Sequence, residues 1–261
     1  MRAGLPAGLA RRLDPGARYG LRLTLLAVAV VLVAVPFGLL LEQVASEGRL
    51  TRLDSSLART LNRQVDPHPL AVDLISAVSF LGKPVWLFVV VGGAVLWLLR
   101  GRRQKLAIFL AVTAIGGGLV DSAVKLAVGR PRPVVTNPIV TAAGKSFPSG
   151  HAMSSVICYG ALMLVFLPMV APRLRRLVVV LTGLLIALIG ASRLALGVHF
   201  LSDVVAGFVL GVAWLVASVA VFEVWREERG RLPTEPTSEG VEPEELAGST
   251  APAEDVGVDD R

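Results

Sequence analysis

Residues Leu177–Leu196 read LVVVLTGLLIALIGASRLAL, an almost unbroken apolar run. A run of about 20 such residues is long enough to cross the hydrocarbon core of a bilayer as an α-helix. Five more runs of this kind occur, and they are Leu23–Leu41, Val85–Leu99, Leu106–Val128, Ala152–Val170 and Val204–Phe222. Because 54% of all residues are hydrophobic, the sequence predicts an all-α polytopic membrane protein with six transmembrane helices and argues against a soluble enzyme.

Two of the six runs are less typical of a membrane span than the others. Val85–Leu99 is short unless residues 81–84 or Arg100 extend it. Leu23–Leu41 follows a basic stretch, as the apolar region of a signal peptide does. It is longer than such regions usually are, and no convincing cleavage site of small residues follows it. We therefore expect a retained transmembrane anchor.

Basic residues in the loops predict the orientation of the chain in the membrane. They precede the first run, separate the second from the third, and separate the fourth from the fifth: Arg11, Arg12, Arg18 and Arg22; Arg100, Arg102, Arg103 and Lys105; Arg173, Arg175 and Arg176. Loops rich in Lys and Arg stay on the cytoplasmic side. With six spans both termini are then cytoplasmic, and we expect an integral protein of the bacterial plasma membrane.

Charge and hydropathy divide the chain into three parts. Residues 1–22 are a basic cytoplasmic N-terminus, residues 23–231 are the six-helix membrane domain, and residues 232–261 are an acidic tail. The tail carries nine acidic residues and one arginine, although the whole chain has a net charge of +6. With few large apolar residues, the tail cannot bury enough surface to offset the entropy lost on ordering. The composition therefore predicts a disordered C-terminal tail.

Leucines recur at helical spacing between the first two runs. Leu50, Leu53, Leu57 and Leu61 share one face, and charged residues occupy most other positions. The pattern predicts an amphipathic helix on the extracytoplasmic side. This helix lies either on the membrane surface or on the transmembrane bundle, since both arrangements use the same apolar face. A second short segment, Pro69–Leu81, is expected at the membrane interface.

Three polar clusters fall at the extracytoplasmic ends of the predicted helices. In chain order they are Lys125 with Arg132-Pro133, then Pro148-Ser149-Gly150-His151, then Ser192-Arg193 with His199 and Asp203. Ionisable side chains near hydrocarbon are costly to place, so they predict a functional site. The remaining histidine, His68, lies in a Pro-rich connector and is expected to be solvated. Cys158 is the only cysteine, so neither an intrachain disulfide nor a thiolate metal site is expected.

The first cluster can hold an anion. Residues 129–131 (Gly-Arg-Pro) should end a helix and turn the chain, so that Lys125 and Arg132 approach one phosphate. Arginine offers a planar fork of donors and lysine a compact charge, and the combination suits a phosphate ester. Asp121 lies one helical turn before Lys125 and is expected to orient its ammonium group.

The second cluster has the composition of a helix start. Ser149 is expected to be the N-cap of the fourth predicted helix. Gly150 has no side chain that would block an anion from the backbone N–H groups at this helix start. Ser-Gly is common capping on its own, and the neighbouring His151 is what favours an anion site.

The third cluster can attack a phosphate. His199 and Asp203 are four residues apart, which lets the carboxylate hydrogen-bond one imidazole nitrogen and leaves the other as a nucleophile. Gly197 can fold Arg193 back toward them as a third cation. His151 is then available as a general acid for the leaving alkoxide. With three cations and no convincing ligand cluster, we expect no metal and no other cofactor.

The clusters resemble the three signature motifs of the type 2 phosphatidic acid phosphatase superfamily. Six residues separate Lys125 from Arg132, five separate Arg193 from His199, and three more precede Asp203. The resemblance implies a six-helix membrane fold with an extracytoplasmic active site, and metal-independent hydrolysis of a lipid phosphate through a phosphohistidine. It also implies these roles: His199 is the nucleophile, Asp203 its orienting partner, His151 the acid, and Lys125, Arg132, Ser149, Gly150 and Arg193 the phosphate ligands.

The substrate is open among phosphatidic acid, phosphatidylglycerol phosphate and undecaprenyl diphosphate. Phosphotransfer to an acceptor hydroxyl, and lipid phosphate binding without turnover, are alternative hypotheses. The expected partners are a lipid phosphate substrate and membrane lipids, with no nucleic acid. The sequence predicts no oligomeric state.

Overall fold

The computed structural model describes residues 37–39, 41–42, 49–134 and 144–227. Across these ranges the regular secondary structure is entirely helical, which confirms the all-α prediction. The elements are α3 (Arg49–Val65), α4 (Pro69–Phe80), α5 (Pro84–Arg100), α6 (Gln104–Val128), α7 (Gly150–Phe166), η1 (Leu167–Met169), α8 (Pro172–Ala195) and α9 (Leu201–Glu227). The basic N-terminus, the acidic tail and most of the predicted first span lie outside the described residues.

Four of the described helices are long and apolar enough to cross a bilayer, namely α6, α7 with η1, α8 and α9. A fifth candidate consists of α4 and α5, which meet at a bend of 44°. Pro84 begins α5, and a proline cannot continue the hydrogen-bond ladder of a preceding helix. The pair explains why the predicted run Val85–Leu99 is short, because α4 continues the path of α5 and packs against α8.

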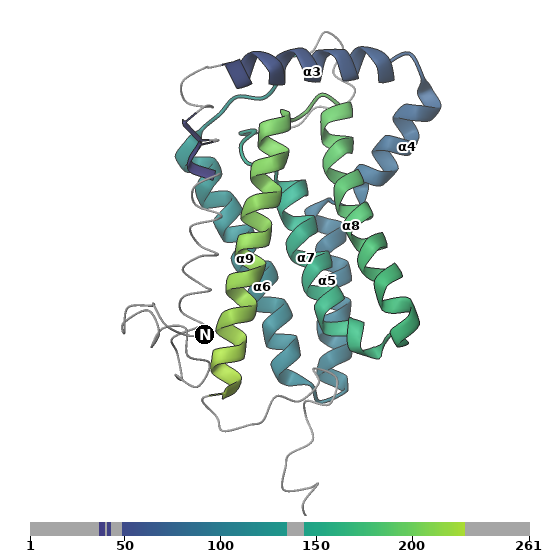
Figure 1. Ribbon diagram of the computed structural model, residues 1–261, viewed down its shortest axis with the longest axis vertical. Helices are drawn as coiled ribbons and strands as arrows, with labels where there is room; N and C mark the ends of the chain where they lie inside the picture. The colour runs from purple at the N-terminus through teal and green to yellow at the C-terminus, as the bar shows by residue number, and fades with distance from the viewer. Residues whose placement is uncertain (1–36, 40, 43–48, 135–143, 228–261) are drawn as a thin grey trace, which may run out of the picture.

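Helix α7 lies at the centre of the bundle and contacts α5, α6, α8 and α9 (Figure 1). Two glycines of α9 allow its close approach. A Cβ atom at Gly207 would lie 2.7 Å from the carbonyl oxygen of Ser149, and one at Gly211 would lie 3.0 Å from that of Met153. The backbones of α7 and α9 are therefore in direct contact, and this contact sets the distance between the first turns of the two helices.

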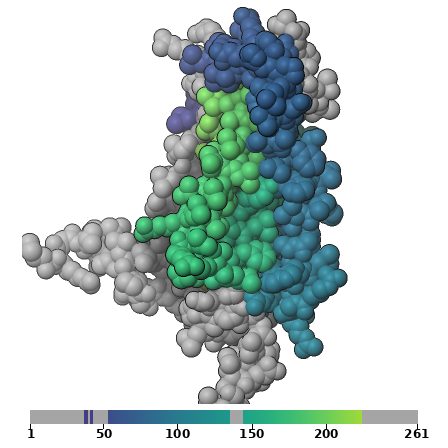
Figure 2. All heavy atoms as spheres, turned by 90° about the vertical axis from the view of Figure 1, so that its right-hand side faces the viewer, coloured from purple at the N-terminus to yellow at the C-terminus, as the bar shows by residue number. Residues whose placement is uncertain are grey.

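Helix α3 lies across one end of the bundle, over α8 and α9 (Figure 1). Figure 2 shows the bundle from the side, where α4 and α5 form a continuous column below α3 and beside α8. The buried face of α3 consists of Asp54, Ala58 and Asn62, whereas Leu53 is 65% exposed. Of the two predicted arrangements, α3 therefore adopts the packed one, but mainly through a stripe of polar and small residues that flanks its leucines.

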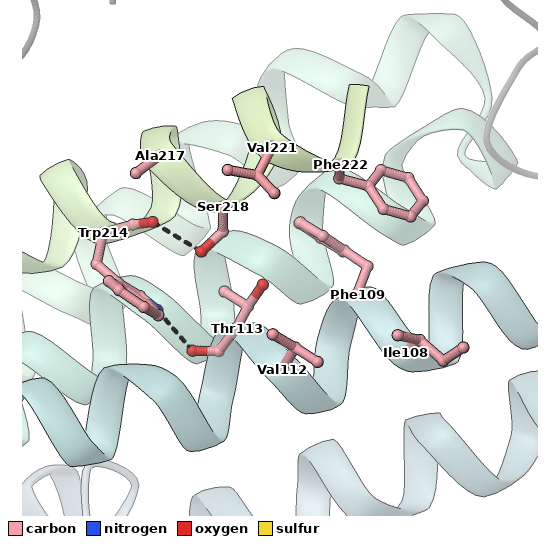
Figure 3. Close-up of a pocket in the computed structure, with 9 residues that line it drawn as sticks. All are labelled: Ile108, Phe109, Val112, Thr113, Trp214, Ala217, Ser218, Val221 and Phe222. Carbon is pink, nitrogen blue, oxygen red and sulfur yellow. Dashed lines mark hydrogen bonds between the residues drawn. The ribbon is translucent and has the colours of Figure 1, made fainter. Parts of the chain in front are cut away.

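An apolar groove of about 270 Å³ lies between α6 and α9 (Figure 3). Its hydrogen bonds are internal: the Trp214 indole N–H donates to the carbonyl of Thr113 at 2.8 Å, and the Ser218 hydroxyl donates to the carbonyl of Trp214 at 2.8 Å. Among the residues that the structure describes, those lining the groove include no ionisable side chain. It lies along the halves of α6 and α9 that are remote from Lys125 and Asp203, so it plays no part in the site described below.

Candidate active site

The three polar clusters meet at the end of the bundle that α3 covers. Successive helices alternate in direction, so the end of α6, the start of α7, the end of α8 and the start of α9 lie at the same end (Figure 1). These termini carry, in that order, Lys125; Ser149, Gly150 and His151; Arg193; and Asp203. Arg132 follows α6, and His199 lies in the short turn between α8 and α9.

His199 and Asp203 form the predicted pair in the interior of the protein. His199 Nδ1 lies 3.4 Å from Asp203 Oδ2, and the same oxygen accepts a hydrogen bond of 2.9 Å from the backbone N–H of Phe200. Both side chains are buried. Burial lowers the pKa of His199, while the hydrogen bond and charge of Asp203 act in the opposite direction. The ring is therefore neutral near pH 7, with one nitrogen available for chemistry.

That second nitrogen faces Arg132. Arg132 Nη1 lies 3.2 Å from His199 Nε2, and it also donates to the carbonyl of Val198 at 2.9 Å. Arg132 Nε donates to the carbonyl of Gly144 at 3.2 Å. Burial lowers the pKa of Arg132, and the charge of Asp203 opposes this effect. Two backbone carbonyls thus hold a guanidinium group directly beside the imidazole.

Three buried polar atoms of the predicted site have no hydrogen-bond partner among the described residues. They are Ser149 Oγ, His151 Nε2 and Arg193 Nε. A buried polar group without a partner costs about 1–3 kcal/mol, so these three atoms are candidates for contacts with a ligand or with water. All three belong to residues that the sequence assigned to phosphate binding or acid catalysis.

Lys125 and Asp121 lie one helical turn apart and form the expected ion pair. The pair packs against the start of α7, because a Cβ atom at Gly150 would lie 2.9 Å from Lys125 Nζ and 3.0 Å from Asp121 Oδ2. The sequence interpretation of Gly150 was therefore incomplete. The missing side chain makes room for the lysine and its carboxylate partner at this helix start.

The prediction that Ser149 is the N-cap of the fourth predicted helix is confirmed. The residue occupies the N-cap position of α7, but its hydroxyl makes no capping hydrogen bond. Its backbone N–H instead donates to the carbonyl of Asp203 at 2.9 Å, which ties the start of α7 to the first turn of α9. The hydroxyl is buried and is one of the three atoms without a partner.

The end of α4 and the turn that follows it contribute contacts that sequence reasoning missed. Ser79 Oγ lies 2.5 Å from Arg193 Nη1, and both residues are buried. A Cβ atom at Gly82 would lie 3.2 Å from the ring of His151. Tyr159 of α7 holds this turn in place, because its hydroxyl donates to the carbonyl of Leu81 at 2.8 Å. The only signal in the sequence was a Gly-Lys-Pro break between two apolar segments.

Two further buried charges were also missed. Arg130 lies inside the first motif and forms ion pairs with Asp203 and with Asp54 of α3. From the sequence, Arg130 was predicted only to belong to a turn, and Asp54 only to the charged positions of an amphipathic helix. Nothing local links residues so far apart in the chain. The described residues also contain no group of three or more His, Cys, Asp or Glu side chains that could hold a metal ion.

Residues 105–227 match the PAP2 superfamily, and this range contains every predicted site residue. A protein of Bacillus subtilis (strain 168), phosphatidylglycerophosphatase B, is 30% identical to this chain over 162 residues, which cover 60% of this chain and 76% of that protein.

Two crystal structures share the fold. One is a transmembrane PAP2-type phosphatidylglycerolphosphate phosphatase from Bacillus subtilis, with a TM-score of 0.65 and 23% identity, covering 78% of this chain and 98% of that one. The other is Aquifex aeolicus LpxE, with a TM-score of 0.51 and 23% identity, covering 64% of this chain and 94% of that one. With the sequence match over the whole site, the chain belongs to the PAP2 superfamily, as a membrane-embedded phosphatase.

Proposed function

We propose that the protein hydrolyses the phosphate of a membrane lipid and that His199 attacks the phosphorus to form a phosphohistidine. The observation that carries this proposal is the setting of the His199 ring. Asp203 lies at Nδ1 and Arg132 lies at Nε2. A neutral imidazole that a carboxylate orients and that lies beside a guanidinium group is arranged to attack an anion held by that group.

The phosphate oxygens would find donors on several sides. Arg132 lies beside the nucleophile, and the Ser149 hydroxyl and Arg193 Nε are buried without partners among the described residues. The start of α7 adds backbone N–H groups, and Lys125 packs against Gly150 at this helix start. Together these groups would stabilise the negative charge of the transferring phosphoryl group.

The reaction then takes two steps. In the first, His199 Nε2 forms a bond to phosphorus while the bond from phosphorus to the leaving oxygen breaks, and His151 gives that oxygen a proton. Asp203 stabilises the positive charge that appears on the His199 ring. In the second, water attacks the phosphohistidine, His151 accepts a proton from the water, and inorganic phosphate leaves. His199 is then neutral again.

A second apolar groove supports a lipid as the substrate. It has a volume of about 300 Å³ and lies between α5, α6 and α7. Among its lining residues, Gly118 lies one helical turn from Asp121, and Ser154 lies one turn from His151. Phe88 lines the groove and is 80% exposed at the side of the bundle. A lipid chain in this groove would have one end near the helical turns that carry Asp121 and His151.

The name of the Bacillus subtilis relative makes phosphatidylglycerol phosphate the first substrate to test. Phosphatidic acid and undecaprenyl diphosphate also present a terminal phosphate on an apolar chain. We place the site on the extracytoplasmic side, with both termini cytoplasmic. The support is charge, because the basic residues between α5 and α6 and those at the start of α8 lie at the end of the bundle opposite α3 (Figure 1).

Phosphate release from each of the three lipids by the purified full chain tests this function. We expect turnover with a chelator present, and a loss on the order of 10³-fold or more in His199→Ala. His68→Ala is the matched control, since His68 is an exposed loop residue. Labelled phosphate should stay on the wild-type protein after an alkaline quench, but not on His199→Ala. Full activity in His199→Ala would refute the mechanism, and transfer of the label to an added alcohol would identify a phosphotransferase.

A further inference from the structure

Asp54 brings a negative charge from α3 into the site. It is 2% exposed and lies on the same buried face of α3 as Ala58 and Asn62. A buried carboxylate is costly unless charges and hydrogen-bond donors surround it. Its Oδ1 accepts a hydrogen bond of 3.1 Å from the backbone N–H of Ser202, and its Oδ2 accepts one from the Ser202 hydroxyl. Asp54 thereby fixes the first turn of α9.

Arg130 lies between Asp54 and the orienting carboxylate Asp203. Its Nη2 lies 3.1 Å from Asp54 Oδ2, and its Nη1 lies 2.6 Å from Asp203 Oδ1. The same Nη1 donates to the Ser202 hydroxyl at 2.7 Å. The guanidinium also lies over the ring of Phe200, at 4.0 Å from its centroid. Four contacts, from α3, from α9 and from the turn that precedes α9, therefore hold Arg130 in one orientation.

The two oxygens of Asp203 consequently have different partners. Oδ1 is bound by Arg130, and Oδ2 accepts from the N–H of Phe200 and faces His199 Nδ1. A carboxylate held at one oxygen cannot rotate, so the other oxygen stays directed at the imidazole. Partners that orient metal-ligating side chains typically affect activity by about 10–100-fold, and we expect an effect of the same size here.

We propose that Asp54 and Arg130 are positioning residues that hold Asp203 and thereby aim His199 at the phosphorus. This inference rests on the proposed phosphohistidine reaction. Neither residue needs to contact the phosphate, because their polar contacts go to Asp203, Ser202 and each other. Changing them should therefore lower kcat and leave KM nearly unchanged.

The pair also balances charge behind the nucleophile. The charged or titratable groups that face His199 are Arg132 from the segment after α6, His151 from α7, Arg193 from α8 and Asp203 from α9. Arg130 and Asp54 lie behind Asp203 and act through it. Arg130 offsets part of the negative charge of Asp203, and Asp54 in turn offsets part of the charge of Arg130.

Removing Arg130 and removing Asp54 should therefore shift the pKa of His199 in opposite directions. Arg130→Met leaves the charge of Asp203 uncompensated, which raises the pKa of His199 and shifts the acid limb of kcat/KM to higher pH. Asp54→Asn leaves Arg130 to act on Asp203 alone, which lowers the pKa of His199 and shifts the limb to lower pH. A purely structural role would not produce shifts of opposite sign.

The test measures kcat, KM and the acid limb for Asp54→Asn, Arg130→Lys and Arg130→Met in the full chain. Asp73→Asn and Arg63→Lys are the controls, since both residues are exposed. We expect kcat to fall roughly 10–100-fold in the three variants and to stay at the wild-type value in the controls. If Arg130→Met does not fold, the test rests on the other two variants. Asp54→Asn keeps the shape of the aspartate side chain, and Arg130→Lys keeps the positive charge.

His199→Ala, measured in parallel, separates the two hypotheses. Wild-type turnover that does not depend on His199 would refute the proposed function. Turnover that depends on His199, together with an unchanged kcat and acid limb in folded Asp54→Asn and Arg130→Lys, would refute only the positioning role. The positioning role would also be refuted if activity fell only in proportion to the amount of folded protein. In that case the remaining folded protein would show an unchanged acid limb of kcat/KM.

Discussion

Ser79 is the residue through which α4 acts on the candidate site. Its hydroxyl is the partner of the buried Arg193 guanidinium, at 2.5 Å. Ser79→Ala would leave a buried cationic group short of one hydrogen bond, which costs about 1–3 kcal/mol of unfolding free energy. It would also release Arg193 from the orientation in which it meets a phosphate. We expect a lower Tm and a raised KM, measured by thermal unfolding and by phosphate release.

Ser56→Ala is the control for this change. Ser56 is exposed on α3, and its hydroxyl donates to the carbonyl of Leu53 in the same helix. Both Tm and KM should stay at their wild-type values. An equal rise in KM for the two variants would show that the contact between Ser79 and Arg193 has no special role.

The burial of His199 predicts how activity depends on pH. Burial holds the pKa of His199 below its ordinary value of 6.5, so the reactive neutral ring persists in mildly acidic solution. We expect the decline of kcat/KM that protonation of His199 causes to lie below pH 6.5. Asp203→Asn removes an influence that raises this pKa, so the decline should move to still lower pH while activity falls.

The same shift bears on stability. The unfolded chain takes up a proton at His199 as the pH falls through 6.5, and the folded chain does not, so this residue makes the folded state less stable at acidic pH. Activity and Tm measured between about pH 4 and 8 check both statements. An acid limb of the wild-type protein centred at or above 6.5 would contradict them.

Local spacing predicts some residue contacts and not others. The pairs Asp121–Lys125 and His199–Asp203 are each one helical turn apart, and both occur in the structure. The contacts of Arg193 with Ser79 and of Arg130 with Asp54 join residues 114 and 76 positions apart. Their existence depends on how the helices pack, which spacing in a single sequence does not reveal.

Helices α7 and α9 form the contact that sets the width of the candidate site. Gly207→Ala would place a methyl group 2.7 Å from the Ser149 carbonyl and 3.0 Å from the side chain of Ala152. The two helices would have to separate, and overpacking of this kind costs about 1–3 kcal/mol. Because the movement shifts Asp203 relative to His151, we expect kcat and Tm both to fall.

Gly183→Ala is the matched control, because Gly183 lies in α8 with no neighbouring atom within 4 Å of an added Cβ. This variant should retain wild-type kcat and Tm. Kinetics and thermal unfolding of the two variants, side by side, provide the comparison. A fully active Gly207→Ala would mean that the spacing of α7 and α9 does not limit the reaction.

Most of the described helices follow from apolar length alone. The run Leu106–Val128 corresponds to α6 (Gln104–Val128), and the run Val204–Phe222 lies within α9 (Leu201–Glu227). A bilayer fixes the length that must be apolar, so the prediction is accurate to a few residues. The bend between α4 and α5 was not predicted, because it depends on the packing of α4 against α8 and on the hydrogen bond from Tyr159 to Leu81.

For the whole molecule, the acidic composition of residues 232–261 sets an expectation about the tail. Every residue proposed to act on the phosphate precedes it in the chain. A chain that ends at Arg231 should therefore keep the wild-type kcat, KM and Tm in detergent, as phosphate release and thermal unfolding would show. A loss of turnover in this truncated chain would mean that the tail contributes to the phosphatase domain.

The bend of 44° between α4 and α5 has a mechanical consequence. With 17 residues at about 1.5 Å each, α5 is roughly 25 Å long, which is less than the hydrocarbon core of about 30 Å. Helix α4 adds length to the same path, and the bend between the two helices lies beside the contacts of Ser79 with Arg193 and of Gly82 with His151. We therefore expect activity to depend on the chain length of the surrounding lipids.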